Sequence, residues 1–383
     1  MNRKIKMGMV GGSIDAFIGA VHRIAANLDG QIELVCGSFS SNAEKTKATA
    51  EALYLDPKRA YATFEEMITK EKQLPEGERM DVVSIVTPNH LHFAPAKMAL
   101  ENGFHVICDK PVTFSLAEAV ELEKIVKNSG LVFALTHTYT GYPMVKEARH
   151  IAMSGRLGKI RKVVVEYPQG WLSTPLETSG QKQADWRTDP KRAGISCCMG
   201  DIGTHAENLA EYVTGLHISE ICADLSTFVP GRLLDDDGNV LIRFQNGAKG
   251  VLHASQISAG EENNINIRVY GEKGGLEWKQ KDNNTLLVKW LDKPVEILRT
   301  GGPGLSSEMA GANTRTPAGH PEGYLEAFAN IYRNFALAVK AHKSGKKLES
   351  KYDFPGIEEG VRGMLFVEKA VESAQKGAIW VKM

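Results

Sequence analysis

Short apolar runs alternate with longer amphipathic stretches over the first third of the chain. The apolar runs have the length of buried strands and occupy Ile5–Val10, Ile32–Gly37, Val82–Val86, His105–Cys108 and Val132–Leu135. Between them, apolar positions recur with the period of a helix, as in Ala43–Ala52, Phe93–Glu101 and Ser115–Asn128. Alternating strands and helices favour right-handed crossovers and a parallel sheet with helices on both faces. The pattern predicts a nucleotide-binding type of α/β domain over residues 1–136.

The pattern changes after about Gly155, where strands follow one another with turn signals between them. Expected strands are Val163–Tyr167, Ile221–Phe228, Val240–Phe244, Gly250–Gln256, Ile265–Tyr270, Gly275–Lys279 and Thr285–Trp290. Expected turns are Asp236–Asn239, Gln245–Gly247 and Gly271–Gly275, and expected helices are Met144–Met153, Gly203–Val213, Tyr324–His342 and Gly356–Gln375. This order predicts a second, α+β domain over residues 137–383, built on a large, mostly antiparallel open sheet.

Composition and charge narrow the function. Of 383 residues, 43% are hydrophobic and 24% charged, as in a globular protein, and 46 basic residues balance 46 acidic ones. This balance argues against a nucleic-acid or membrane-surface partner. The five cysteines are odd in number and form no Cys-x-x-Cys, so we expect neither disulfides nor a zinc site. The expected location is a reducing cytoplasm. With no secretory leader pattern and no long uncharged apolar stretch, we expect no membrane span.

A glycine-rich turn follows the first strand. Gly11, Gly12 and Ser13 lead into a helix that begins near Phe17 and Ile18. Glycine permits close backbone approach to a pyrophosphate, and a helix N-terminus offers free N–H groups. Gly19 lies eight positions after Gly11, where the usual fingerprint has five, so a turn without a ligand is the alternative.

The end of the second strand bears on cofactor choice. No acid stands there to bind ribose hydroxyls, as a strict NAD site usually requires. Ser40 and Lys45 would suit a 2′-phosphate, while Ser40 and Asn42 acting only as helix caps is an equal alternative. The residues therefore leave NAD and NADP both open.

Polar residues also follow the third and fourth strands. Thr87, Asn89 and His92 lie within Thr-Pro-Asn-His-Leu-His, and Asp109 and Lys110 begin Asp-Lys-Pro. The carboxyl ends of parallel strands are where open α/β folds bind ligands, so we expect these residues to contact the cofactor. In isolation, Asp-Lys-Pro is more often a surface turn.

A pair of chemically active residues stands in the second domain. Asp201 and His205 are four apart, so on a helix they share one face. Histidine, with an ordinary pKa of about 6.5, is a suitable base for a hydroxyl proton. A helix-capping Asp201 and a packed core His205 are the alternative.

Together and in this order, the glycine turn, Thr-Pro-Asn-x-x-His, Asp-Lys-Pro and Asp-x-Gly-x-His resemble the motifs of the Gfo/Idh/MocA oxidoreductases. This family includes glucose–fructose oxidoreductase and myo-inositol 2-dehydrogenase. The resemblance covers essentially the whole chain. Asp109 stands where glutamate is commoner, the glycine turn is longer than usual, and Cys197 and Cys198 stand where small residues are usual. The role of these two cysteines stays open.

The resemblance implies a Rossmann domain that binds NAD or NADP and a C-terminal domain that binds substrate. It implies His205 as acid/base, Lys110 as the residue that binds the reacting hydroxyl, and Asp201 as the residue that orients either His205 or the sugar. A sugar or polyol is the implied substrate, with a homodimer or homotetramer formed through the C-terminal sheet. Further substrate contacts are expected from Tyr139, Trp171, Trp186, Arg187 and His320.

Two other functions are weighed against a dehydrogenase. One is a glycoside-cleaving enzyme that oxidises its substrate transiently with NAD, and the other is a dinucleotide sensor without catalysis. A sensor need not keep Lys110, Asp201 and His205 together, which argues against it. A metal site is not expected, because His90 and His92 have no third ligand at a recognisable spacing.

Overall fold

The computed structural model describes residues 3–383, which divide into two compact units. The first unit comprises the chain up to Gly141 together with Tyr324–Val361, and the second comprises Tyr142–Gly323 together with Arg362–Met383. The sequence pattern predicts a division at residue 136/137, with everything after it in the second domain. In the structure, Tyr324–Val361 belongs to the first unit instead, and the packing of this segment explains why.

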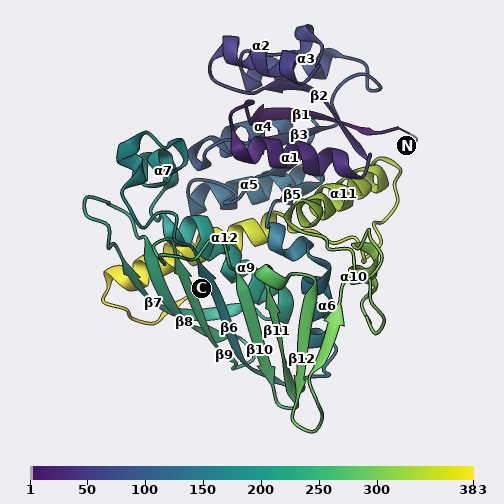
Figure 1. Cartoon of the computed structure of the whole chain (residues 1–383). Coiled ribbons are helices and arrows are strands. Elements are labelled where there is room, and N and C mark those ends of the chain that lie inside the picture. The colour runs from purple at the N-terminus through teal and green to yellow at the C-terminus, as the bar shows by residue number, and fades with distance from the viewer. Residues whose placement is uncertain (1–2) are drawn as a thin grey trace. The chain divides into compact units, whose positions relative to one another are not determined.

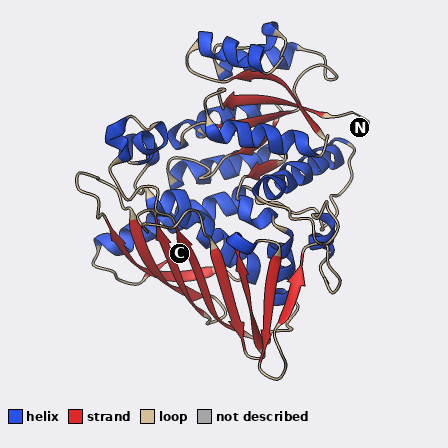
Figure 2. Cartoon of the chain, in the orientation of Figure 1, coloured by secondary structure: helices blue, strands red, loops and turns tan. Residues whose placement is uncertain are grey.

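The first unit is a parallel sheet covered by helices (Figures 1 and 2). Its strands are β1 (Ile5–Gly11), β2 (Ile32–Ser38), β3 (Val82–Val86), β4 (His105–Cys108) and β5 (Phe133–Leu135), and its helices are α1 (Phe17–Leu28), α2 (Ala43–Ala52), α3 (Phe64–Gln73), α4 (Phe93–Glu101), α5 (Leu116–Ser129) and α11 (Tyr324–Lys343). The strands lie in the order β2-β1-β3-β4-β5, and every neighbouring pair is parallel. The expected parallel α/β fold is confirmed.

Helix α11 belongs to the first unit because its apolar face completes that unit's core. Phe328, Tyr332 and Phe335 are buried in one cluster with Ile5 and Met7 of β1. Burial of a large aromatic side chain is worth about 2–3 kcal/mol, so the cluster ties a segment from the far end of the sequence to the sheet. Sequence periodicity predicts this helix but not the sheet that it covers.

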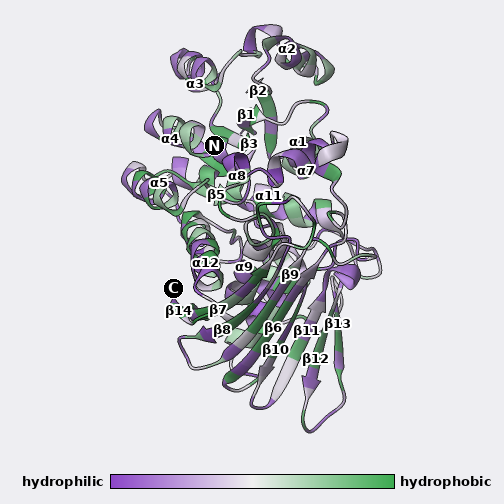
Figure 3. Cartoon of the chain, turned by 90° about the vertical axis from the view of Figure 1, so that its left-hand side faces the viewer, coloured by the Kyte–Doolittle hydropathy of each residue, from purple (hydrophilic) through white to green (hydrophobic). Residues whose placement is uncertain are grey.

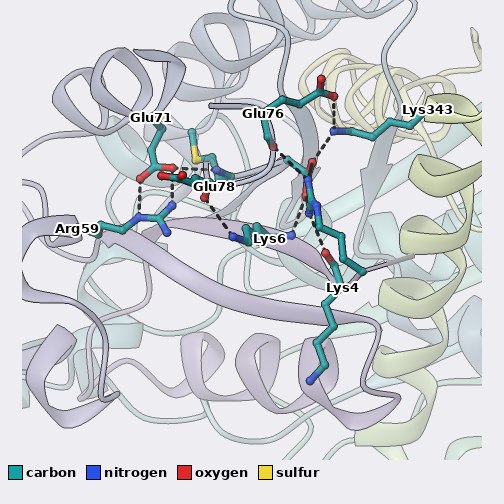
Figure 4. Close-up of polar contacts among 10 residues, drawn as sticks. Lys4, Lys6, Arg59, Glu71, Glu76, Glu78 and Lys343 are labelled. Atoms are coloured by element: carbon teal, nitrogen blue, oxygen red, sulfur yellow. Dashed lines mark hydrogen bonds and ion pairs between the residues drawn. The ribbon is translucent and has the colours of Figure 1, made fainter. Parts of the chain in front are cut away.

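Two buried carboxylates secure the amino-terminal side of the first sheet (Figure 4). Glu71 accepts hydrogen bonds from Arg59 (2.6 and 2.9 Å) and from the Met80 backbone N–H (2.8 Å). Asp81, which precedes β3, accepts from Arg3 and also contacts Lys343 at the end of α11. Because cations and donors satisfy both carboxylates, their evident role is to hold strands and helices together.

The second unit is built on a nine-stranded sheet. Its strands are β6 (Ile160–Pro168), β7 (Ile218–Ser226), β8 (Asp237–Phe244), β9 (Lys249–Ser255), β10 (Asn266–Gly271), β11 (Gly274–Lys279), β12 (Thr285–Trp290), β13 (Glu296–Arg299) and β14 (Val381–Lys382). They lie in the order β13-β12-β11-β10-β6-β9-β8-β7-β14, and β6 with β9 is the parallel pair among antiparallel ones. The expected large, mostly antiparallel sheet is confirmed.

Helices pack against one face of this sheet. They include α6 (Pro143–Met153) and α9 (Thr204–Thr214), and the unit also contains α7 (Lys182–Arg187), α8 (Pro190–Ala193), α10 (Glu308–Ala312) and most of α12 (Ile357–Gln375). α9 contacts β6, β9 and β10, while α6 contacts β11 and β12. Side chains alternate between buried and more exposed positions along β6 and β8, and Figure 3 shows hydrophobic and hydrophilic residues interspersed along the strands. One face of the sheet therefore lies in the core.

One expected turn is wrong. Residues 236–239 were predicted to form a tight turn, but β8 already begins at Asp237. The chain instead reverses over residues 227–236, where the Asp236 carboxylate accepts hydrogen bonds from the backbone N–H groups of Phe228 and Val229. A buried carboxylate thus closes a longer loop, which local turn statistics do not reveal.

No helix among residues 3–383 combines the length and apolar character needed to cross a membrane.

Candidate active site

The expected cofactor residues of the first unit follow four adjacent strands. Gly11 ends β1 and is followed by Gly12, Ser13, Phe17 and Ile18; Ser40 and Lys45 follow β2, Thr87, Asn89 and His92 follow β3, and Asp109 and Lys110 follow β4. These strands are neighbours in the order β2-β1-β3-β4 and run parallel, so their carboxyl ends form one edge. The sheet therefore brings motifs separated by up to a hundred residues to one side of the unit.

The glycine turn has the tight geometry of a dinucleotide cradle. Gly11 and Gly12 have φ of +81° and +71°, which side chains rarely adopt. A Cβ on Gly19, the third residue of α1, would stand 2.4 Å from the Gly12 Cα. The buried hydroxyl of Thr87, at the neighbouring strand end, has no hydrogen-bond partner within the described chain. A close backbone turn beside an unsatisfied buried donor fits a bound dinucleotide.

Residues after β2 are engaged with one another. Lys45 Nζ lies 2.6 Å from an Asp15 carboxylate oxygen, and both side chains are partly exposed. The Asn42 side chain accepts from the Lys45 N–H as the cap of α2, and the Ser40 hydroxyl accepts from the Asn42 N–H. The capping alternative is thus realised for Asn42.

His92 ties together the loops after β3 and β4. Its Nδ1 lies 2.8 Å from the Pro111 carbonyl, and its Nε2 lies 2.8 Å from the Thr87 carbonyl. Burial lowers the pKa of this imidazole. With both ring nitrogens on backbone oxygens, His92 positions Thr87 and the Lys110–Pro111 segment. Asn89, which lies between Thr87 and His92 in the sequence, is buried at the start of a 3₁₀ turn (Asn89–Leu91).

A buried polar network surrounds Asp109, the residue before Lys110. Its carboxylate accepts from the Lys110 N–H (2.9 Å) and from the Thr136 hydroxyl (2.7 Å), and His22 Nε2 lies 3.8 Å away. His22 Nδ1 in turn lies 2.7 Å from the Tyr332 hydroxyl. Burial alone would raise the pKa of Asp109, but His22 and Lys110 outweigh it and hold the pKa below its usual range. An ionised Asp109 thus stands beside the Lys110 ammonium.

In the second unit, Asp201 lies within a π-helical turn (Met199–Gly203) that leads directly into α9. Asp201 Oδ2 accepts from Arg187 Nε (3.1 Å) and from Gln256 Nε2 (2.8 Å). The Arg187 guanidinium lies 4.2 Å from the Trp186 ring centroid and 5.9 Å from that of Trp171. Four of the expected substrate residues, Trp171, Trp186, Arg187 and Asp201, therefore form one cluster.

A second carboxylate, that of Asp235, binds the residues at the start of the π-helical turn. Asp235 accepts hydrogen bonds from the Ser196 hydroxyl and from the backbone N–H groups of Cys197 and Met199, at 2.9–3.1 Å. Burial raises the pKa of Asp235. The helix expected over Gly203–Val213 begins at Thr204 in the structure. Asp201 therefore lies in the π-helical turn before it, and its carboxylate binds side chains from other segments. π-Helical turns of this kind are frequent at functional sites.

The remaining expected residues lie in different surroundings. His205, on the first turn of α9, is 8% exposed, and its ring centroid is 6.2 Å from that of Tyr167. Tyr139 is buried in the first unit, within Thr138–Gly141. His320 is exposed, and its Nδ1 lies 3.2 Å from the Pro317 carbonyl of its own loop. His205 thus shares a segment with Asp201, whereas the His320 contact described within residues 3–383 is to its own loop.

Three residues that matter for this geometry were not predicted: Gln256, Asp235 and His22. Gln256 ends the expected strand Gly250–Gln256, which also contains His253 and Ser255, so its position gives only a weak signal for a polar contact. Nothing near His22 in the sequence identifies Tyr332 as its partner.

Two family models match the chain. Residues 5–137 match the oxidoreductase family with an NAD-binding Rossmann fold, and residues 145–277 match the GFO/IDH/MocA C-terminal domain. An uncharacterized oxidoreductase of Bacillus subtilis is 33% identical over all of this chain and 98% of its own length. The chain belongs to the Gfo/Idh/MocA family of oxidoreductases. Its first unit is the NAD-binding Rossmann domain of that family.

Other members of the Gfo/Idh/MocA family have known ligands. An inositol dehydrogenase homolog from Azotobacter vinelandii, solved with NAD⁺, superimposes with a TM-score of 0.96 at 35% identity over 100% of this chain and 98% of that one. The same homolog has been solved with NADH and myo-inositol. Levoglucosan dehydrogenase from Pseudarthrobacter phenanthrenivorans is 27% identical over 83% of this chain and 84% of its own length.

Within residues 3–383, no three His, Cys, Asp or Glu side chains come together in a way that would hold a metal ion.

Proposed function

We propose that this protein oxidises a secondary hydroxyl of a sugar, polyol or glycoside to a ketone with NAD⁺, or catalyses the reverse reaction. The observation that carries the proposal is the Asp201 cluster, in which a carboxylate, a guanidinium and two indole rings come together on the segment that leads into His205. Carboxylates and arginines bind hydroxyl groups, and aromatic faces suit the C–H faces of sugar rings. The ligands of the Azotobacter and Pseudarthrobacter relatives, myo-inositol and levoglucosan, support this substrate class.

The proposed mechanism divides the work between cofactor and protein. Bound NAD⁺ supplies the hydride acceptor. Lys110 binds the reacting hydroxyl as an ammonium and stabilises the developing alkoxide, while the ionised Asp109 beside it favours that charge. A ring nitrogen of His205 accepts the hydroxyl proton, and Asp201 orients the imidazole or a neighbouring hydroxyl.

A substrate panel tests the proposal. The purified protein is incubated with NAD⁺ or NADP⁺ and with myo-inositol, levoglucosan, free hexoses and aryl glycosides, and NADH absorbance and products are followed. We expect NADH and a ketone product with at least one uncharged polyol or sugar. Release of aglycone without NADH would instead establish transient oxidation with glycoside cleavage. Tight NAD⁺ binding without turnover of any substrate would contradict the proposal.

We also propose that a second copy of the chain covers the exposed face of the large sheet. Cys222, Leu241, Val251 and Val164 are cross-strand neighbours on β7, β8, β9 and β6, and all four are at least partly exposed. Leu241 alone is 49% exposed. An apolar row on an open sheet favours association. We expect a dimer or tetramer by analytical ultracentrifugation, and a smaller species for Leu241→Glu; a monomeric wild type would contradict this.

We place the reaction in the cytoplasm, a location supported by the five cysteines, which are all free thiols.

A further inference from the structure

We infer that Gln256 is a positioning residue for Asp201, and that the Cys197 thiol fixes the orientation of the Gln256 amide. The inference rests on the proposed role of Asp201 in catalysis. It assigns a function to Gln256, which no motif indicates, and to one of two adjacent cysteines.

The Gln256 side chain is held at both ends. Its Nε2 donates to Asp201 Oδ2 at 2.8 Å, and its Oε1 accepts from Cys197 Sγ at 3.3 Å. Burial raises the pKa of the Cys197 thiol, so the sulfur keeps the proton that it donates. Because the thiol faces the carbonyl oxygen of the amide, the NH₂ group faces the carboxylate. Only one of the two amide orientations satisfies both neighbours.

The Gln256 backbone is equally fixed. Gln256 is fully buried directly after β9, its N–H donates to the Asp236 carbonyl, and its carbonyl accepts from the Leu172 N–H. The amide therefore reaches Asp201 from the rigid sheet, whereas Arg187 reaches the same oxygen from the short helix α7. Two donors on Oδ2, from two different segments, fix the rotation of the Asp201 carboxylate.

The neighbouring cysteine provides a matched control. Cys198 is buried like Cys197, and burial likewise raises the pKa of its thiol. Among the described contacts, the bond to Gln256 is made by Cys197. If bulk alone mattered, alanine at either position would have the same effect on turnover. If the hydrogen bond matters, only Cys197→Ala lowers turnover, and Cys197→Ser, which keeps a donor, restores it.

Gln256→Glu gives a signature that a structural role would not produce. The new carboxyl faces Asp201. The charged groups that act on the neighbouring Cys197 thiol are Asp235, Asp201, Arg187 and Arg232, and His205 lies on the first turn of α9 after Asp201. Two adjacent carboxylates share a proton, so the pair regains a donor toward Asp201 only at lower pH. We expect the pH–kcat profile to move toward acid by about one unit.

The experiment compares full-length Gln256→Met, Gln256→Glu, Cys197→Ala, Cys197→Ser and Cys198→Ala with wild type, using NAD⁺ and the best substrate of the panel. We expect Gln256→Met to lower kcat about 10- to 100-fold, with NAD⁺ affinity unchanged. We expect a loss of about 3-fold for Cys197→Ala, because a thiol is a weak donor, and wild-type kcat for Cys197→Ser and Cys198→Ala.

Each result is decisive. Wild-type kcat for Gln256→Met, or equal losses for the two alanine variants, would overturn the inference. If Gln256→Met does not fold, the pH profile of Gln256→Glu decides, and an unshifted profile counts against the inference. Asp201→Asn separates the two proposals: if it retains wild-type turnover, the proposed function of Asp201 fails, whereas its inactivity beside a fully active Gln256→Met overturns the positioning role alone.

Discussion

The two units build their functional residues in different ways. In the first unit, each expected cofactor residue stands between the end of a parallel strand and the first turn of the next helix, so strand order gathers them at one edge. In the second unit, Asp201 is oriented by Arg187 and Gln256, which come from a short helix and from the end of a distant strand. The first arrangement is a property of the topology, and the second depends on particular side chains.

This difference predicts different tolerance to substitution. Cofactor binding at strand ends depends on backbone geometry, so NAD⁺ affinity should be sensitive to added volume at the glycines and less sensitive to individual polar side chains. A site assembled from side chains is sensitive to the loss of single hydrogen bonds. Variants that separate backbone from side-chain effects therefore test the comparison.

The largest effect is expected from the two groups proposed to act on the substrate. His205→Asn and Lys110→Met should each lower kcat by roughly 10²- to 10⁴-fold, because general acid–base and electrostatic stabilisation contribute on this scale. NAD⁺ affinity, measured by calorimetry, should remain within a few-fold of wild type for His205→Asn. Substantial turnover in both variants would remove these residues from the mechanism.

A smaller but distinct effect is expected from Gly19→Ala. The added methyl would stand 2.4 Å from the Gly12 Cα and 2.8 Å from the Gly12 carbonyl oxygen, so the backbone of the cradle must move. We expect NAD⁺ to bind about 10-fold or more weakly, because pyrophosphate contacts depend on that backbone. Gly77→Ala is the matched control, since no atom lies within 4 Å of a Cβ there. Equal NAD⁺ affinity in the two variants would show that the cradle tolerates the shift.

The same difference explains how far the sequence predicts the molecule. The strands of the first unit and the residues after them follow from local periodicity, and Asp201 and His205 from a short motif. The partners of those residues do not follow, because they are distant in sequence: Gln256 is 55 residues from Asp201, and Tyr332 is 310 residues from His22. The reversal before Asp237 was likewise missed, because a buried carboxylate rather than a turn residue closes it.

Stability against acid should also differ between the units. In the first unit, burial lowers the pKa of His105 and of His137 to about 3. Each unfolded histidine binds a proton near pH 6.5, so the folded state loses about 1.4 kcal/mol per histidine for each pH unit below that value, until the folded pKa is reached. In the second unit, the raised pKa of Asp235 acts in the opposite sense, and its contribution is lost as pH rises through that pKa.

Hydrogen exchange measures this prediction for each unit separately. Between pH 7 and pH 5, after correction for intrinsic rates, peptides from β4 should lose protection, and peptides from β8 should lose less. His105→Asn, which keeps an acceptor for the Val132 N–H, should reduce the loss in β4. Equal acid sensitivity of β4 in wild type and His105→Asn would contradict the assignment to that histidine.

The smallest effect is expected at Lys45, the polar residue after β2 whose side chain is paired with Asp15. Both partners are more than a third exposed, and surface pairs of this kind contribute about 0–1 kcal/mol. NAD⁺ has no 2′-phosphate for Lys45 to bind, so Lys45→Ala should change NAD⁺ affinity less than about 3-fold in calorimetry. A loss of NAD⁺ affinity above about 10-fold would mean that this side chain helps to build the strand-end site, against the expectation that topology and backbone geometry define it.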